Sequence, residues 1–320
     1  MRPPFTITPE ILRSVSQIER LIGRIEGLEQ PKPQPHLRKS NRVRTVQGSL
    51  AIEGNTLDLD QVTALLEGKR VLGKKEEIAE VLNAIKVYDG LAGVDPLLVK
   101  SLLKAHRVMM GGLISGAGKW RSQNVGILKG SAVSHIAPKA DRVPYLMDEL
   151  FAFLKDKELH PLIRSCVFHY ELEFIHPFPD GNGRIGRFWH TLLLYHYHEV
   201  FEFIPIESLI SDHQQDYYAA LEASDKSGDS TVFVEFSLGM IRASLEDFLE
   251  SFVPKPFTAE ERVDRAKGHF GGAEFSRKDY LGLFKSISTA TASRDLKQGI
   301  EDGVLVKKGD KALTKYRFEG

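Results

Sequence analysis

The sequence predicts a mainly α-helical protein with one small β-hairpin and a separate C-terminal module. Most of the 320 residues fall into stretches in which apolar side chains recur every three or four positions, the spacing of one helix face. Glycine and proline divide these stretches, and strand-like patterns are confined to short segments near residues 123–136 and 304–318. The chain therefore lacks the regular strand–helix alternation of an α/β fold.

The composition is that of an ordinary globular protein, with 42% hydrophobic and 27% charged residues. The 43 Lys and Arg residues balance the 43 Asp and Glu residues, so no overall field attracts nucleic acid or an anionic membrane. We find no apolar run of membrane-spanning length and no signal-peptide core, and the single Cys166 cannot form an intramolecular disulfide. These observations predict a protein of the reducing cytoplasm without membrane contact.

The N-terminal third, residues 1–95, is expected to be helical. Thr8 or Pro9 can begin a first helix that ends near Gly27, and prolines 31, 33 and 35 then form a stiff connector. Further helices are expected at about 37–52, 58–68, 75–88 and 96–108. Asp58 and Gln61 have the spacing of a capping box at the second of these.

Residues 176–187, which read HPFPDGNGRIGR, combine a titratable base, a possible metal ligand, three glycines and two arginines. The apolar spacing before them predicts a helix that ends at His176, because Pro177 and Pro179 cannot continue it. A second helix is expected from about Arg184 to His198, and the N-terminus of a helix binds anions. The stretch therefore predicts a phosphate cradle with a base at its mouth.

The side chains of this stretch specify the cradle further. Arg184 and Arg187 are three residues apart, so both guanidinium groups lie on one side of the second helix and suit a polyphosphate. Asp180 can hold a magnesium ion beside the same phosphates. Residues 181–186 also match the GxGxxG dinucleotide pattern, but a broken helix precedes them instead of a strand.

These twelve residues resemble the signature of the Fic family, H-P-F-x-D/E-G-N-G-R-x-x-R, with every specified position filled. Members of that family move AMP from ATP to a hydroxyl of a target protein. The resemblance implies a Fic-type helical core at residues 96–252, with ATP and Mg²⁺ as cofactors. It implies catalytic roles for His176, Asn182 and Arg184 and a metal ligand at Asp180. It also implies these nucleotide contacts: Phe178, Gly181, Asn182, Gly183, Arg184, Gly186, Arg187 and Tyr217.

A second resemblance concerns residues 49–55, SLAIEGN. From the residues alone, Glu53 is a solvated acid at a helix C-terminus, where the helix dipole disfavours it unless a partner compensates. The stretch resembles the family's inhibitory motif, S/T-x-x-x-E-G/N, with Ser49, Glu53 and Gly54 in place. In the family this glutamate pairs with the second signature arginine, here Arg187, so the resemblance implies a chain that restrains itself.

Residues 123–130 predict a strand and turn with a partner strand near Ser134–Ile136. This hairpin occupies the position of the family's flap, and its edge, with Val125, Gly126, Ile127 and Leu128, could hold a target segment by main-chain pairing. Tyr217 and Tyr218 follow on a later helix. Paired tyrosines are usually core residues, whereas the family places a tyrosine from an equivalent stretch near the nucleotide base.

A Pro-rich boundary at residues 253–256 separates a C-terminal module, 257–320. Helices at 275–284 and from Thr289 or Thr291 through Ile300, then strands at 304–306 and 316–318, give the order of a winged helix. Residues 255–320 carry 14 Lys and Arg against 10 Asp and Glu, an excess of 14 − 10 = 4. Arg294 and Lys297 allow DNA binding, and protein docking or dimerisation suits the module equally.

The sequence thus predicts a protein adenylyltransferase that moves AMP from ATP to a Ser, Thr or Tyr hydroxyl of a target protein, restrained by Glu53. Self-modification and a homodimer are both compatible with this prediction. A DNA-binding regulator whose core senses a nucleotide, and removal of AMP at the same site, are the two alternatives.

Overall fold

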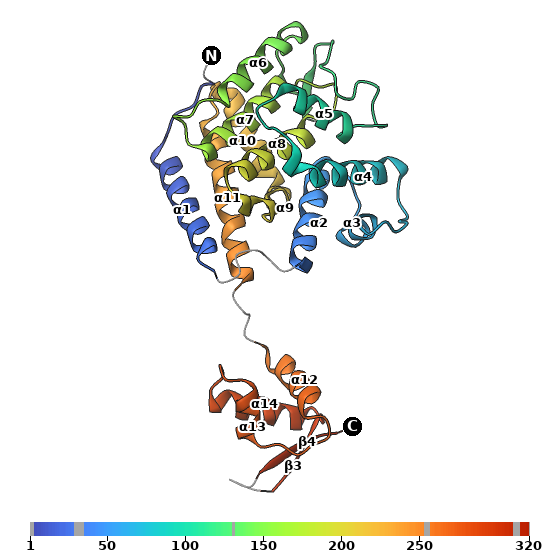
Figure 1. Cartoon of the computed structure of the whole chain (residues 1–320), viewed down its shortest axis with the longest axis vertical. Coiled ribbons are helices and arrows are strands. Elements are labelled where there is room, and N and C mark those ends of the chain that lie inside the picture. The colour runs from blue at the N-terminus through green and yellow to red at the C-terminus, as the bar shows by residue number, and fades with distance from the viewer. Residues whose placement is uncertain (1–2, 29–34, 130–131, 253–256, 310–313, 320) are drawn as a thin grey trace. The chain divides into compact units, whose positions relative to one another are not determined.

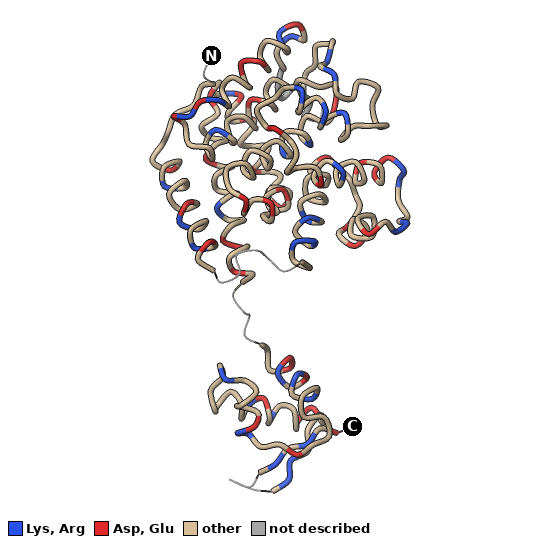
Figure 2. Tube along the Cα trace, viewed as in Figure 1, with Lys and Arg blue, Asp and Glu red and all other residues tan. Residues whose placement is uncertain are grey.

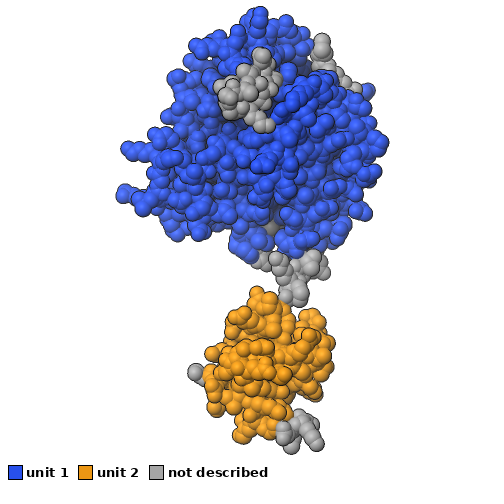
Figure 3. All heavy atoms as spheres, turned by 180° about the vertical axis from the view of Figure 1, so that it is seen from behind, with its two compact units in different colours: residues 1–252 blue, residues 253–320 orange. Residues whose placement is uncertain are grey.

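The computed structural model describes residues 3–28, 35–129, 132–252, 257–309 and 314–319. The chain divides into two compact units, residues 1–252 and 253–320, which Figure 3 shows in different colours. The structure is mainly helical with a small antiparallel hairpin, as the sequence predicts.

The first unit contains the following elements: α1 (Pro9–Glu26), α2 (Pro35–Ala51), α3 (Leu59–Leu66), α4 (Lys75–Asp89), α5 (Val99–Met109), β1 (Gly126–Lys129), β2 (Ala132–Ile136), α6 (Val143–Phe153), α7 (Pro161–Ile175), α8 (Asn182–Tyr197), α9 (Ile206–Asp212), α10 (Gln214–Ser227) and α11 (Thr231–Ser251). In Figure 1, α7 and α8 lie in the middle of this unit, with α1 and α11 along one side and α2 to α4 on the other. One continuous apolar core joins these helices, and α7 and α8 contribute its central side chains.

Helix ends follow the capping chemistry of the sequence. The side chain of Thr8 accepts the backbone N–H of Ile11 at the start of α1, and Asp58 and Gln61 form the expected capping box of α3. Three starts differ from the expectation: α2 begins at Pro35 instead of about Leu37, α5 at Val99 instead of Pro96, and α8 at Asn182 instead of about Arg184. Proline suits the first turn of a helix, which explains Pro35, and prolines 31 and 33 of the expected connector lie outside the described residues.

Helix α2, which leads into the segment 49–55, packs very closely on α9. A Cβ added to Gly48 would lie 2.6 Å from the Cα of Ser208, so only glycine permits this approach. The Asn41 side chain donates to the carbonyl of Phe203 at 2.8 Å, and Gln214 of α10 donates to the carbonyl of Ile52 at 2.8 Å. These contacts fix α2 along its length, and its last residues therefore reach the centre of the unit in a defined position.

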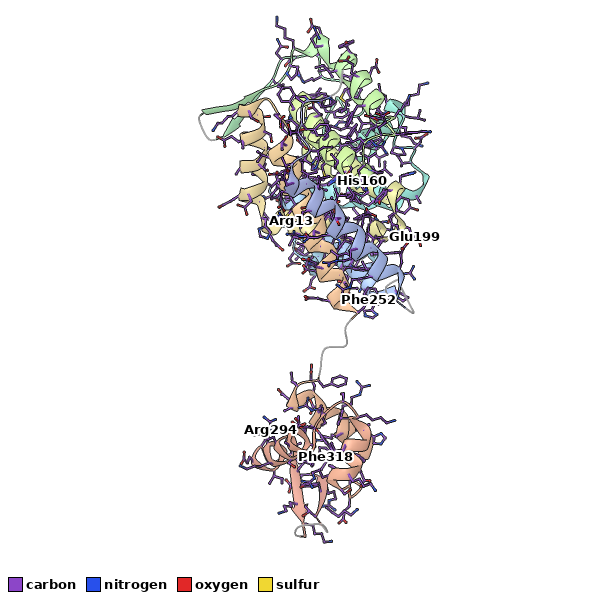
Figure 4. The ribbon with its side chains drawn as sticks, turned by 90° about the vertical axis from the view of Figure 1, so that its left-hand side faces the viewer. Arg13, His160, Glu199, Phe252, Arg294 and Phe318 are labelled. Atoms are coloured by element: carbon purple, nitrogen blue, oxygen red, sulfur yellow. The ribbon has the colours of Figure 1, made fainter. Side chains whose placement is uncertain are left out.

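The second unit consists of α12 (Ala259–Phe270), α13 (Arg277–Leu283), α14 (Thr289–Glu301) and the antiparallel pair β3 (Leu305–Lys308) and β4 (Lys315–Phe318). It has its own apolar core, in which Phe318 lies, whereas Arg294 lies at the surface (Figure 4). Helix α12 is absent from the sequence expectation, and Ser288 caps α14 instead of Thr289 or Thr291. The turn at 310–313 and the Pro-rich boundary at 253–256 lie outside the described residues, and the winged-helix assignment stays a prediction.

Positive and negative side chains are interspersed over the first unit, as Figure 2 shows for α1 and α4. None of the described helices combines the length and the apolar character needed to cross a membrane.

Candidate functional site

His176 ends helix α7 in a left-handed conformation, with φ 49° and ψ 60°. It is the only non-glycine residue with positive φ among the described residues. Such a conformation is unfavourable for a residue with a side chain, and it persists only where the surroundings enforce it. Pro177 blocks further helix, and the backbone N–H of His176 remains bonded to the carbonyl of Leu172 at 3.0 Å. The turn thus carries the imidazole out of the helix at a fixed point.

Arg121 holds this turn from outside the signature. Its Nε donates to the carbonyl of His176 at 2.7 Å, and its backbone N–H donates to the carbonyl of Pro177 at 2.9 Å. The remaining guanidinium donors reach the carbonyls of Gln123 and Pro138, which lie at the two ends of the hairpin, and that of Ile175. One buried side chain therefore joins the His176 turn to the base of the β1–β2 hairpin.

His106 supports the next residues of the loop. Its Nδ1 accepts the backbone N–H of Gly118 at 2.8 Å, so its other nitrogen carries the proton and donates to the carbonyl of Asp180 at 2.9 Å. The imidazole stacks on Phe178 with ring centroids 3.6 Å apart. Burial lowers the pKa of His106 to about 4, so this residue is neutral near pH 7 and acts as a structural support.

Asn182 closes the loop over the start of α8. Its side chain accepts the backbone N–H of Phe178 at 2.9 Å and donates to the carbonyl of the same residue at 3.0 Å. Gly181 precedes it with φ 82°, and a Cβ there would lie 2.5 Å from the sulfur of Met110. The loop therefore places the N-terminal N–H groups of α8 beside these residues, and their use as an anion site stays a prediction.

Arg184 lies in the first turn of α8 between two carboxylates. Its Nη1 donates to Oε1 of Glu80 at 2.6 Å, and its Nη2 lies 3.2 Å from Oδ1 of Asp180. The Asp180 side chain is 56% exposed, so this carboxylate opens toward solvent while the guanidinium is buried. The partner on α4, Glu80, carries no signal in the sequence.

Arg187 is bound by Ser49 and Glu53 of the segment 49–55. Its Nη2 donates to Oε1 of Glu53 at 2.7 Å and to the carbonyl of Ser49 at 2.8 Å, and its Nε donates to Oγ of Ser49 at 3.2 Å. The guanidinium is 1% exposed and the Glu53 side chain is 30% exposed. Burial lowers the pKa of Arg187, but the charge of Glu53 outweighs it and holds this pKa above its usual value.

Two signature glycines leave room for acidic side chains. A Cβ on Gly183 would overlap Oε1 of Glu53, and a Cβ on Gly186 would lie 2.6 Å from Oε1 of Glu173. Burial raises the pKa of Glu173 to about 8, and the nearby charge of Arg187 opposes this rise. Burial therefore favours the neutral form of Glu173 near pH 7.

The two tyrosines of α10 lie in different environments. Tyr217 is 1% exposed and packs against Phe233 and Phe236, whereas Tyr218 is 41% exposed and its hydroxyl lies 3.3 Å from the carbonyl of Ile52. Tyr217 is thus a core residue, the usual place for such a pair, and its contact with a nucleotide stays a prediction. Tyr218 is the accessible tyrosine beside the inhibitory motif.

The hairpin expected at residues 123–136 is present. Gly126 pairs with Ile136 and Ile127 with His135, and the register shifts between Ile127 and Leu128. Val125 lies just before β1. Figure 4 shows the hairpin extending beyond the helices of the first unit. Binding of a target segment along its edge stays a prediction.

The donor set suits magnesium held together with a substrate. The described residues contain no group of three His, Cys, Asp or Glu side chains that could hold a metal by themselves. Mg²⁺ commonly takes one or two carboxylates and completes its shell with phosphate oxygens and water. The half-exposed carboxylate of Asp180, at the start of α8, offers such a ligand.

Comparisons with known proteins agree with this geometry. Residues 96–194, which include the signature, match the Fic/DOC family. A crystal structure of a Fic family protein from Desulfovibrio desulfuricans G20 is 41% identical in sequence, with a TM-score of 0.76 over 100% of this chain and 99% of that one. The chain belongs to the Fic family.

Relatives of lower sequence identity match part of this Fic protein. Protein adenylyltransferase Fic of Culex quinquefasciatus is 30% identical over 246 residues, which are 72% of this chain and 47% of that protein. The chain therefore spans about half the length of the curated relatives it matches. Fic-1 of C. elegans, at 23% identity and a TM-score of 0.63 over 77% of this chain, shares the fold.

Proposed function

We propose that this Fic protein is a protein adenylyltransferase, which transfers AMP from ATP to a Ser, Thr or Tyr hydroxyl of a target protein and is restrained by Glu53. The observation that carries the proposal is the pairing of Arg187 with Glu53 at 2.7 Å, beside a helix N-terminus that suits phosphates. The names of the relatives, protein adenylyltransferase Fic, support the reaction class.

The proposed cradle is the first turns of α8. The backbone N–H groups from Gly181 to Arg184 and the two guanidinium groups bind the triphosphate, and Gly183 keeps this surface free of a side chain. Gly186 supports the site differently, because it lets α8 pack closely on Glu173 and His169 of α7. The side chain of Asn182 fixes the loop through its two hydrogen bonds with the backbone of Phe178. At the base position we favour Tyr218 over the expected Tyr217, because only Tyr218 is accessible.

His176 acts as the general base. It takes the proton of the target hydroxyl, whose oxygen attacks the α-phosphorus in line; the new P–O bond forms as the bond to the β-phosphate oxygen breaks, and pyrophosphate leaves. Arg184 stabilises the charge on the leaving group. Asp180 would hold a magnesium ion, which neutralises phosphate charge when bound. The target segment pairs with the edge of β1 beside this base.

The restraint follows from competition for one guanidinium. Arg187 uses its Nη2 and Nε on Glu53 and Ser49, so these donors are not available to the γ-phosphate. Hydrogen bonds between charged partners are stronger than neutral ones, so Arg187 stays on Glu53 and ATP binds without this contact, in an unproductive pose. Glu53 also lies at the C-terminal end of α2, where the helix dipole disfavours an anion unless a cation compensates, and Arg187 supplies that cation.

The test uses the full chain with Glu53→Gly, His176→Ala and both changes together. Each protein is incubated with cell lysate and ATP labelled either at the α-phosphate or at the γ-phosphate. We expect Glu53→Gly to raise labelling from α-labelled ATP only, both of lysate proteins and of the chain itself, and His176→Ala to abolish it. An increase in labelling from γ-labelled ATP over lysate alone that His176→Ala removes would indicate phosphate transfer by this chain and contradict the proposal.

Removal of AMP at the same site is a second candidate, favoured by the position of Glu53. Its carboxylate is 30% exposed at the edge of the site, where it can orient a water molecule. A protein that already carries AMP, incubated with the chain and with Glu53→Gln, would distinguish the directions. Release of AMP by the unaltered chain that Glu53→Gln abolishes would favour the reverse reaction.

DNA binding through residues 257–320 is a separate candidate. Lys and Arg gather on β3 and β4 in Figure 2, where Lys307, Lys308, Lys315 and Arg317 lie. A gel-shift series with the full chain would test it, because phosphate contacts make affinity fall steeply with salt. Binding that does not depend on salt, or no binding, would leave protein docking or dimerisation as the role of this unit.

A further inference from the structure

Glu80 of α4 contacts both the signature and the inhibitory motif. One carboxylate oxygen, Oε1, accepts Nη1 of Arg184 at 2.6 Å, and the other, Oε2, accepts Nδ2 of Asn55 at 2.8 Å. Asn55 lies two residues after Glu53, in the turn that ends the inhibitory motif. A single partly buried carboxylate thus connects the first signature arginine with the turn that carries Glu53.

Asn55 makes three further hydrogen bonds that attach this turn to neighbouring residues. Its Nδ2 also donates to the carbonyl of Glu77 at 3.1 Å, and its Oδ1 accepts the backbone N–H of Leu57 at 3.1 Å. The backbone N–H of Asn55 donates to the carbonyl of Leu50 at 3.1 Å, and Gly54 allows the turn with φ 88°. A movement of Glu53 away from Arg187 therefore disturbs Asn55 and, through it, Glu80.

The guanidinium of Arg184 is held but not fully used. Asp180 and Glu80 place two negative charges on its one positive charge, which weakens its attraction for a phosphate. Its Nε is buried and has no hydrogen-bond partner within the part of the chain that the structure describes. A buried donor without an acceptor is unfavourable, so this arginine is arranged for another oxygen ligand.

We propose that Glu80 is a positioning residue of the restraint: it holds Arg184 as Glu53 holds Arg187, and Asn55 couples the two acids so that they release the arginines together. The inhibitory segment then acts on both signature arginines instead of one. This inference rests on the proposed function, because it assigns the two arginines to the triphosphate.

Glu80→Gln separates the two contacts of this carboxylate. A glutamine offers one acceptor oxygen and one NH₂ group, whereas Glu80 needs an acceptor on each side, toward Arg184 and toward Asn55. One contact must therefore be lost, and the negative charge disappears in either case. We expect ATP to bind about fivefold more tightly, the lower end of ordinary coupling between sites.

The experiment measures ATP affinity of the full chain by calorimetry with Mg²⁺, and AMP transfer in parallel. The variants are Glu80→Gln, Glu53→Gly, the double variant and Asn55→Ala. The last leaves the contact between Arg184 and Glu80 in place and removes the link from Glu80 to the turn, together with the bonds of Asn55 to Glu77 and Leu57. Glu76→Gln, at an exposed position of the same helix, is the control and should match the unaltered chain. Coupling predicts that the double variant gains less than the product of the two single gains, and that Asn55→Ala gains less than Glu80→Gln.

Each outcome decides one point. Unchanged or weaker ATP binding by Glu80→Gln overturns the inference, because a merely structural role predicts a loosened site that binds less. A fully multiplicative double variant overturns the coupling through Asn55. If Glu53→Gly binds ATP but transfers no AMP, the proposed function fails while the binding data still judge Glu80; if no variant binds ATP, both fail. Should Glu80→Gln not fold, Glu80→Asp keeps the charge on a shorter side chain, and an unchanged affinity there has the same meaning.

Discussion

The carboxylate of Glu53 occupies the space that a side chain on Gly183 would fill. A Cβ built on Gly183 would overlap Oε1 of Glu53 and lie 2.9 Å from Nη1 of Arg187. The absent side chain of the signature glycine therefore admits the carboxylate of Glu53. Under the proposed function the same space lets phosphates approach the backbone, and the two occupants exclude each other.

Gly183→Ala tests this steric relationship through stability. We expect the change to lower the free energy of unfolding of the unaltered chain by about 1–3 kcal/mol, the usual cost of overpacking. In the Glu53→Gly background the same change should cost clearly less, because its main obstacle is gone. Urea denaturation of the four proteins measures the difference.

Gly239→Ala is the matched control for this comparison. Gly239 lies within α11 with no atom near the place of its Cβ, so alanine there should stabilise the chain by about 0.5–1 kcal/mol in both backgrounds. An equal cost of Gly183→Ala with and without Glu53 would show that the acid does not occupy this space in solution.

Ser49→Ala should release part of the restraint. The change removes the acceptor of the Nε of Arg187 but leaves the Ser49 carbonyl and Glu53 in place. We expect AMP transfer to rise, though by less than with Glu53→Gly, and stability to fall by about 1–3 kcal/mol because a buried donor loses its partner. Ser40→Ala, at an exposed position of the same helix, should alter neither quantity.

The sequence predicted the local features of this fold well because the signals are local. Thr8, Asp58 and the prolines act within one helical turn, and the signature places its base, glycines and arginines within twelve residues. The sequence also predicted the partner of Glu53, through the resemblance of its motif. The pairing of Arg187 with Glu53 joins α8 to α2 and follows from no spacing in the chain.

The residues that hold the signature from other segments could not be predicted, because local sequence signals do not report contacts between distant segments. His106, Arg121 and Glu80 reach the signature from α5, from the segment before the hairpin and from α4, and each reads as an ordinary helix or loop residue. Tyr217 and Tyr218 are adjacent, and only the packing of α10 on α11 decides which one is buried. Contacts between distant segments depend on tertiary packing, which periodicity does not encode.

Arg121→Lys tests the support of the His176 turn. Lysine keeps the charge but has a single ammonium group, which cannot reach the carbonyls of His176, Gln123 and Pro138 together. In the Glu53→Gly background we expect kcat of AMP transfer to fall more than tenfold with little change in ATP affinity, since misplacement of a base slows chemistry more than binding. Arg142→Lys, at an exposed position, is the control; loss of ATP binding together with kcat would instead indicate general disruption.

Glu173 should make stability depend on pH in a direction opposite to that of an ion-paired acid. Burial raises its pKa to about 8 from an ordinary value of 4.5, so between these pH values the unfolded chain loses this proton and the folded chain keeps it. Stability therefore decreases as pH rises through this window, by up to about 1.4 kcal/mol per pH unit, and the loss stays constant above pH 8.

Glu173→Gln is neutral throughout, so the difference in free energy of unfolding between variant and unaltered chain should grow from pH 5 to pH 8. The neighbouring His169, His190 and Arg187 are present in both proteins, so their own contributions cancel in this difference to first order. Urea denaturation at four pH values measures it, with the exposed Glu76→Gln as control; a difference that does not change with pH would mean that Glu173 is ionised in the folded protein.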